Sequence, residues 1–183
     1  MIELPSLTTE RLVLRGYTAE DAPALQALAS DRRIAATTLN IPHPYPPDGA
    51  LQFILNDHER RARGEGFGFA ITRRDDGALL GGIGLRLQRS LQAEMGYWVG
   101  VPYWGQGYTS EAARRLIAFG FDELGLNRIY ASYFGNNPAS ARVMQKAGMI
   151  YEGAMKGHIL KWGEYLDLGF YGILRSDYEG QGR

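Results

Sequence analysis

The segment PYWGQGYTSEA, which begins at Pro102, combines a proline, two close glycines and the start of a helix. Pro102 lacks a backbone donor, and Gly105 and Gly107 can adopt conformations closed to other residues, so the segment predicts a turn. The helix expected from Thr109 has unpaired amides and partial positive charge in its first turn. Glycines let such amides approach a phosphate closely, so an anion site is predicted. A tight connection that binds no ligand has the same spacing, and both interpretations stay open.

The flanking segments position this turn. The segment from Glu94 to Val101 predicts a strand, because every second residue is apolar: Met95, Tyr97, Val99 and Val101. After the turn, apolar or small residues recur at helical spacing and a glycine supplies a stop, at Ala113, Leu116, Ile117, Gly120, Leu124 and Gly125.

The rest of the chain predicts further short strands and helices. Thr18 and Asp21 form a capping-box pattern before a helix that breaks near Ser30, and Asn137 is a good N-cap for a helix that ends at Gly148. A proline-rich loop spans residues 40–47, and the helix after it is expected to bury Leu51, Ile54, Leu55 and His58. The other strands are expected over residues 10–17, 66–72, 79–87, 128–134, 149–156 and 164–174.

This order of elements predicts an α+β fold of three layers. The strands over 66–72, 79–87 and 94–101 form an antiparallel meander, because a turn at Asp75, Asp76 and Gly77 joins the first two and a second turn near Ser90 leads into the third. The path from the strand at 94–101 through a helix to the strand at 128–134 predicts one parallel pairing. The sheet is therefore mixed, with helices packed on it.

Length and composition exclude several classes of function. The 183 residues fit one domain over 1–183, and the 20 acidic and 20 basic residues balance, so no nucleic-acid partner is indicated. The absence of cysteine excludes disulfides, thiolate metal sites and a cysteine nucleophile. The chain has neither a signal peptide nor an apolar stretch long enough to span a membrane, so we expect no membrane partner and a cytoplasmic location.

Five blocks of the sequence resemble the GNAT superfamily of N-acetyltransferases, and within it the RimJ/RimL-like branch of ribosomal-protein N-terminal acetyltransferases. The blocks cover nearly the whole chain: TERLVLRGYTAEDAPAL, PHPYP, GYWVGVPYWGQGYTSEA, NNPASARVMQKAGMIYEG and GEYLDLGFYGILRSDY. The resemblance implies the GNAT fold, a mixed and mostly antiparallel sheet of six to seven strands with helices on both faces, splayed between the fourth and fifth strands. One departure concerns the motif Q/R-x-x-G-x-G/A, because Pro102 stands where Gln or Arg is usual; this should weaken the grip on the cofactor without abolishing it.

The resemblance implies acetyl-CoA as a co-substrate, no metal, and a primary amine as acceptor. We expect a protein or peptide N-terminal α-amine, since its pKa of about 7.7–8 leaves it partly neutral near pH 7. Two alternatives stay open: a small amine such as a polyamine, amino acid or antibiotic, and a non-catalytic acyl-CoA sensor of the same fold. Members of the branch are monomers or homodimers.

The resemblance also assigns roles along the cofactor. The pantetheine arm is expected to pair with the backbone of Val99 and Val101, and the amide of Val99 or Gly100 is a candidate oxyanion donor. Asn137 and Ser140 are expected near the pantetheine. The pyrophosphate is expected on the amides of Gly105, Gln106, Gly107, Tyr108 and Thr109.

Without a cysteine, direct attack by the amine is the simplest route, and two side chains are candidates for proton transfer. Glu94 is the candidate general base, although a solvated or ion-paired carboxylate is equally consistent with its position. Ser140 is the candidate acid or thiol-orienting group, although it could be an ordinary serine in the first turn of a helix. Residues that could line the clefts include Arg142 and Lys146 for the cofactor, Trp98 and Trp104 for the cofactor or the acceptor, and His43, Tyr45, Glu152, Glu164, Asp167 and Tyr171 for the acceptor.

Overall fold

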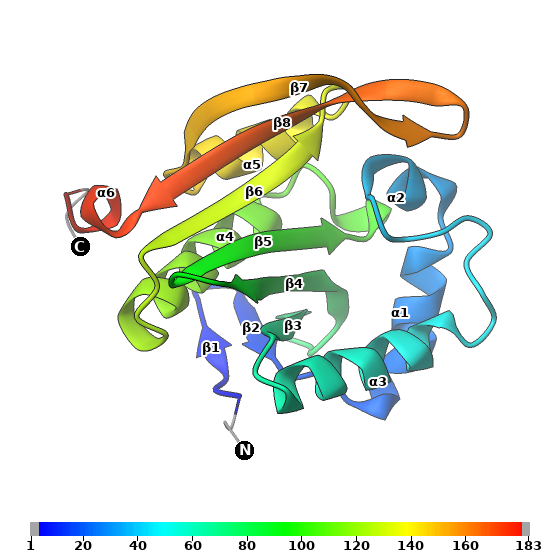
Figure 1. Ribbon diagram of the computed structural model, residues 1–183. Coiled ribbons are helices and arrows are strands. Elements are labelled where there is room, and N and C mark those ends of the chain that lie inside the picture. The colour runs from blue at the N-terminus through cyan, green and yellow to red at the C-terminus, as the bar shows by residue number, and fades with distance from the viewer. Residues whose placement is uncertain (1–3, 181–183) are drawn as a thin grey trace.

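The computed structural model describes residues 4–180 and contains one eight-stranded mixed sheet (Figure 1). The strand order is β1-β2-β3-β4-β5-β6-β8-β7, and all neighbouring pairs are antiparallel except β5 and β6. The strands are β1 (Leu7–Thr8), β2 (Leu12–Arg15), β3 (Gly66–Arg73), β4 (Leu79–Gln88), β5 (Gln92–Val99), β6 (Arg128–Phe134), β7 (Ile150–Lys161) and β8 (Glu164–Leu174).

Helices cover both faces of this sheet, as the sequence predicts (Figure 1). The short helices α1 and α2 and the longer α3 precede the meander, and α4 and α5 follow β5 and β6 respectively. Their bounds are η1 (Ala19–Asp21), α1 (Ala22–Ala29), α2 (Arg32–Thr37), α3 (Gly49–Ala62), η2 (Val101–Tyr103), α4 (Tyr108–Ala118), η3 (Phe119–Glu123), α5 (Pro138–Lys146) and α6 (Arg175–Gly180).

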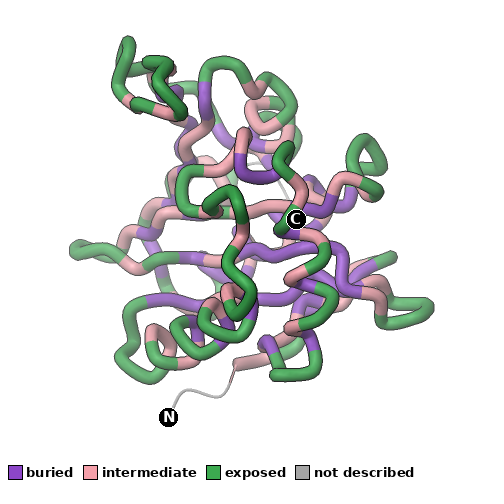
Figure 2. The backbone as a smooth tube through the Cα atoms, turned by 90° about the vertical axis from the view of Figure 1, so that its right-hand side faces the viewer, coloured by how far each residue is buried: buried purple, intermediate pink, exposed green. Residues whose placement is uncertain are grey.

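Two apolar layers separate the sheet from its helices. The larger one joins Phe67, Phe69 and Ile71 of β3 to α4 and α5, because alternate residues of a strand face the same side. The smaller one joins Ala70 of β3 and Ile54 of α3 to α1 on the opposite side. Figure 2 shows the resulting pattern, with buried segments through the middle of the molecule and exposed segments at its loops.

The parallel pairing of β5 and β6 is confirmed, and it is short. Only Gln92, Ala93 and Glu94 pair with β6, opposite residues 128–130. Beyond Glu94 the two strands diverge, as Figure 1 shows, so β5 has no partner on that side as far as Val99. This is the splay that the resemblance implies, and it lies between the fifth and sixth strands because β1 precedes the predicted ones.

Several predicted boundaries are wrong. The sheet has eight strands instead of six to seven, because Leu7–Thr8 pairs with β2. The central strand ends at Val99 instead of Val101, since Pro102 starts the turn η2. In α3 the predicted buried edge is also displaced: Leu51 and Leu55 are 42% and 45% exposed, and the buried residues are Ala50, Ile54 and Asp57. No helix within residues 4–180 is long and apolar enough to cross a membrane.

The predicted capping box before α1 is confirmed, and it gives a prediction about stability. Asp21 accepts a hydrogen bond from the Thr18 amide at 2.9 Å and pairs with Arg15 at 2.7 Å. Burial acts to raise the pKa of Asp21, but these hydrogen bonds outweigh burial and lower it. A lowered carboxyl pKa stabilises the fold above the unfolded-state value of about 3.9, and this contribution is lost as pH falls through the folded-state value.

We expect Asp21→Ala to lower the free energy of unfolding by about 1–3 kcal/mol at pH 7, because the half-buried Arg15 guanidinium and the Thr18 amide lose their buried acceptor. The difference from wild type should shrink as pH falls below about 4, where the wild-type carboxyl also becomes protonated. Urea unfolding at pH 7 and pH 3 measures both. Asp76→Ala, which removes an exposed partner of Arg73, is the control and should leave the unfolding midpoint nearly unchanged. An equal loss at both pH values would contradict the ionic role of Asp21.

Candidate functional site

A cleft of about 300 Å³ lies at the end of β5, beyond its pairing with β6, and extends from the glycine turn to α5. Its walls come from α2, the end of β5, the glycine turn, the first turn of α4 and one side of α5 along its length. The predicted residues that line it are Val99, Gly105, Gly107, Thr109, Asn137 and Ser140, together with Trp98, Trp104, Arg142 and Lys146.

The glycine turn has the geometry of an anion site. Gly105 and Gly107 lie in the left-handed region, with φ of 76° and 81°, and Gly107 is the N-cap of α4. In the described part of the chain, the amides of residues 105–110 have no hydrogen-bond acceptor. These unpaired donors lie at the positive end of α4, so they can bind a phosphate through the backbone alone.

Arg11, just before β2, and Glu111 of α4 hold this turn in place. Arg11 donates to the Gln106 carbonyl at 3.0 Å and pairs with Glu111 at 2.7 Å, and its guanidinium lies 4.6 Å from the centre of the Tyr108 ring. The Gln106 side chain donates to the Pro102 carbonyl at 2.9 Å. The sequence carries no local signal for this role of Arg11, because its link to the turn is a contact across 95 residues.

The backbone of β5 narrows the choice of oxyanion donor. The Gly100 amide donates to the Leu80 carbonyl at 2.8 Å, so the proposed use of the Gly100 amide is wrong. Because successive residues of a strand direct their backbone groups to opposite sides, the Val99 amide faces the gap beside β6. The Val99 carbonyl is occupied, since it accepts the Trp104 indole N–H at 2.7 Å. Val101 lies in η2, so its expected pairing as a strand residue is also wrong.

Asn137 and Ser140 lie at the start of α5, and Ser140 contacts Tyr97 of β5 within the cleft. Asn137 is the N-cap of α5 and accepts the Ser140 amide at 3.2 Å. The Tyr97 hydroxyl lies 3.0 Å from Ser140 Oγ and donates to the Ser140 carbonyl at 3.0 Å. Burial raises the pKa of Tyr97, so this group is a neutral hydroxyl and a hydrogen-bond donor. In the sequence, Tyr97 looks like a core residue of an alternating strand, and only the splay brings it into the cleft.

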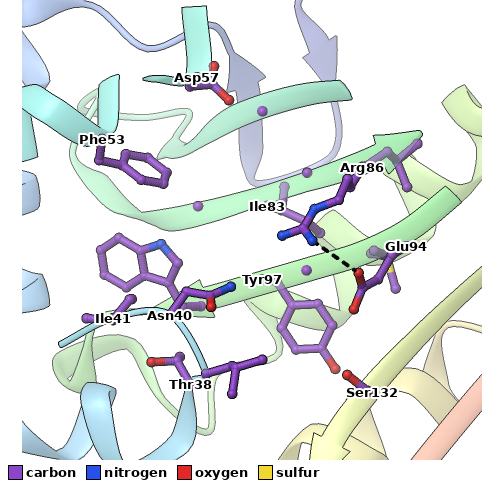
Figure 3. Close-up of a pocket in the computed structure, with 18 of the residues that line it drawn as sticks. Thr38, Asn40, Ile41, Phe53, Asp57, Ile83, Arg86, Glu94, Tyr97 and Ser132 are labelled. Atoms are coloured by element: carbon purple, nitrogen blue, oxygen red, sulfur yellow. Dashed lines mark ion pairs between the residues drawn. The ribbon is translucent and has the colours of Figure 1, made fainter. Parts of the chain in front are cut away.

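A second cavity of about 560 Å³ lies over the α3 side of the sheet (Figure 3). Aromatic side chains and the proline-rich loop supply much of its wall, from Tyr17, Asn40, Ile41, Tyr45, Phe53 and Trp98. It shares five residues with the cleft: Thr37, Thr38, Tyr97, Trp98 and Ser140. The two spaces therefore meet where β5 parts from β6.

Two carboxylates line this second cavity. Glu94 is the last residue of β5 that pairs with β6, and its carboxylate is 3.8 Å from the Arg86 guanidinium (Figure 3). Its side chain keeps 32% of its surface exposed, so it remains accessible from the cavity. Asp57 comes from α3 and is only 3% exposed.

Most of the other acceptor residues considered from the sequence lie elsewhere. Tyr45 lines the second cavity, but Glu152 pairs with Arg128 and Asp167 pairs with Lys156 at 2.7 Å. Tyr171 is buried in the core and accepts a hydrogen bond from Gln145.

Comparison with known proteins assigns a family to this arrangement. Residues 11–150 match the sequence profile described as an acetyltransferase (GNAT) domain. The uncharacterized N-acetyltransferase YoaA of Bacillus subtilis is 31% identical over 173 residues, which cover 93% of this chain and 97% of YoaA. The putative ribosomal N-acetyltransferase YdaF of the same organism is 29% identical over 94% of this chain and 96% of its own length.

The solved structures include a close match to the fold. The crystal structure of a GNAT-family acetyltransferase from Bacillus anthracis superposes with a TM-score of 0.84 at 26% identity, and the match covers 94% of this chain and 99% of that one. The eight-stranded sheet and its helices are therefore an arrangement that other members of the family share.

Proposed function

The chain belongs to the GNAT family of acetyltransferases, and from this premise we propose where each substrate binds and how the acetyl group moves. The enzyme is an N-acetyltransferase with acetyl-CoA as its co-substrate. The cleft holds acetyl-CoA, and the second cavity holds the acceptor amine. The observation that carries this proposal is the junction at Tyr97 and Ser140, where the two spaces meet beside the unpaired edge of β5.

The cofactor is held mainly by backbone groups. The pyrophosphate lies on the free amides of residues 105–109, which need no side chain at position 102. This explains how the turn can function with Pro102 in place of Gln or Arg. The pantetheine arm follows β5 to the Val99 amide, and Arg142 and Lys146 at the cleft wall are placed to meet a phosphate.

The acetyl group passes directly from the thioester to the amine, without an acyl-enzyme intermediate. The neutral amine attacks the thioester carbonyl carbon, and the new C–N bond forms as the carbonyl oxygen becomes an oxyanion. The Val99 amide donates to that oxyanion, an interaction that contributes about 2.7–4 kcal/mol in other acyl-transfer enzymes. The C–S bond then breaks. Glu94 accepts the amine's proton, directly or through a water, and the hydroxyl pair of Tyr97 and Ser140 supplies a proton to the thiolate.

We expect Tyr97→Phe to lower kcat about 10-fold, because the departing thiolate loses a donor, although a thiolate needs less help than most leaving groups. The KM for acetyl-CoA should change less than twofold. Steady-state thiol release measures both constants. Tyr103→Phe, which removes a hydroxyl elsewhere in the same cleft, is the matched control. A wild-type kcat for Tyr97→Phe would remove Tyr97 from the mechanism.

The proposed acceptor is the α-amine of a protein or peptide. Two observations support this acceptor. One relative is described as a putative ribosomal N-acetyltransferase, and the second cavity, beside the proline-rich loop, is large enough for a terminal residue. The test offers three substrates at equal concentration: a peptide with a free N-terminus, the same peptide blocked at its N-terminus but carrying a lysine, and a small alkylamine. Mass spectrometry should find the acetyl group on the free N-terminus. Acetylation confined to the alkylamine would contradict the proposed acceptor and leave the enzyme class intact.

A further inference from the structure

Asp57 is a buried carboxylate that the acetyl transfer does not use. It is 3% exposed, and its Oδ2 atom has no hydrogen-bond partner within residues 4–180. A side chain at Gly68 would displace it, since a Cβ atom there would lie 1.9 Å from Asp57 Oδ1. The sheet therefore leaves room for this carboxylate over β3, at the wall of the second cavity (Figure 3).

A row of glycines leads across the sheet from Asp57 to β5, the strand that contains Glu94 and Tyr97. Gly68 of β3 is in register with Gly84 of β4, and Gly84 with Gly96 of β5. All three line the second cavity, and a Cβ atom at Gly96 would meet nothing within 4 Å. Because neighbouring strands lie about 4.8 Å apart, the row forms a floor without side chains that spans roughly 10 Å from Asp57 to β5.

The walls above this floor suit a cation. Tyr17 and Phe53 meet edge to face, with ring centroids 5.3 Å apart, and Trp98 lies beyond them on β5. The Tyr17 hydroxyl occupies the space over Gly82, next to the floor, and burial keeps it un-ionised by raising its pKa. Aromatic faces beside a carboxylate attract a cationic nitrogen.

No ion pair within residues 4–180 supplies that cation. Arg60, Arg61 and His58, on the same helix, are the nearby basic groups, and none of them pairs with Asp57; the Tyr17 hydroxyl is the other titratable group beside it. Burial raises the pKa of Asp57 against the effect of these neighbours. An isolated buried carboxylate is costly, and a cation that pairs with it offsets part of that cost.

We propose that the acceptor carries a second cationic nitrogen, which binds Asp57 across the glycine floor while the first nitrogen is acetylated beside Tyr97. This inference rests on the proposed function, because it places the acetylated amine at the junction of the two cavities. The second nitrogen can belong to a small diamine or to a basic side chain near a peptide N-terminus. In either case the separation of the two nitrogens is on the order of 10 Å, as two strand spacings require.

The test compares α,ω-diamines of increasing length with monoamines and amino alcohols of the same lengths, by thiol release from acetyl-CoA. We expect kcat/KM to be about 10- to 100-fold higher for a diamine of matching length than for its monoamine, the range of one charged hydrogen bond. In Asp57→Asn this ratio should fall towards one. Asp76→Asn, an exposed change in the β3–β4 turn, should keep the wild-type ratio. A second arm compares peptides with lysine or norleucine at position two, and shows which source the second nitrogen has.

The outcomes separate this inference from the proposed function. Acetylation of monoamines and diamines with equal kcat/KM would contradict the binding of a second nitrogen but not the acetyltransferase activity. Equal rates for amino alcohols and diamines would show that the second group need not be charged. An absence of thiol release with every amine tested would remove the proposed function itself. If Asp57→Asn does not fold, Gly96→Val gives an independent test. Its side chain enters open space on the floor, so it should lower kcat/KM for the long diamine more than for a short monoamine. Equal losses for both would count against the floor.

Discussion

Replacing Glu94 with glutamine is expected to lower kcat by about 100-fold or more, the usual contribution of a positioned general base. Glutamine keeps the shape of the side chain but cannot accept the proton of the attacking amine. The affinity for CoA should stay within about twofold, since the carboxylate lines the acceptor cavity and not the cofactor cleft. Steady-state kinetics and calorimetric CoA binding give the two quantities separately.

A control is needed because Glu94 also faces Arg86 at 3.8 Å. If the carboxylate only neutralised this arginine, Arg86→Met would reproduce the loss of activity seen with Glu94→Gln. We expect Arg86→Met to keep kcat within about threefold, because a long, partly exposed ion pair contributes little. Equal activity of Glu94→Gln and the wild-type enzyme would end the assignment of Glu94 as the base.

Replacing Gly107 with valine is expected to weaken CoA binding about 5- to 150-fold, or about 1–3 kcal/mol. The residue has φ of 81°, which a β-branched side chain adopts only with strain. Relief of that strain would move the amides of residues 105–109 out of the positions in which they face a phosphate. Calorimetry with CoA measures the change, and a thermal melt establishes that the variant is folded.

Gly77→Val is the matched control for this strain. Gly77 has φ of 72° in the turn between β3 and β4, and open space around its Cβ position. The substitution should lower the melting temperature and leave the Kd for CoA unchanged. Wild-type CoA affinity in Gly107→Val would show that the phosphates bind elsewhere.

The sequence predicts the elements of this fold well where the signals are local. The capping residues Thr18 and Asn137 and the positive-φ Gly148 lie where expected, because each acts on a backbone only a few residues away. The parallel pairing of β5 and β6 also follows from local order, since a strand, a helix and another strand can return only by a crossover.

Contacts between distant segments set the features that the sequence does not reveal. The Gly100 amide is not free for a ligand because it donates to the Leu80 carbonyl of β4. The position of Tyr97 in the cleft depends on how far β5 and β6 diverge. The expected buried edge of α3 included Leu51 and Leu55, which are exposed, and it did not include Asp57, which is 3% exposed. Only the glycine opposite it, at position 68 in β3, makes room for the carboxylate.

The central claim is that acetyl-CoA and an amine meet at Tyr97 and Ser140 and exchange an acetyl group directly. The most direct measurement is thiol release from acetyl-CoA across a panel of N-terminal peptides, alkylamines, diamines and free amino acids, with mass spectra of the products and of the intact enzyme. We predict release with at least one class, one acetylated amine for each thiol, and no mass gain on the enzyme when the amine is left out. Tight CoA binding with no release for any amine would contradict the claim and identify the chain as a binding protein with the same fold.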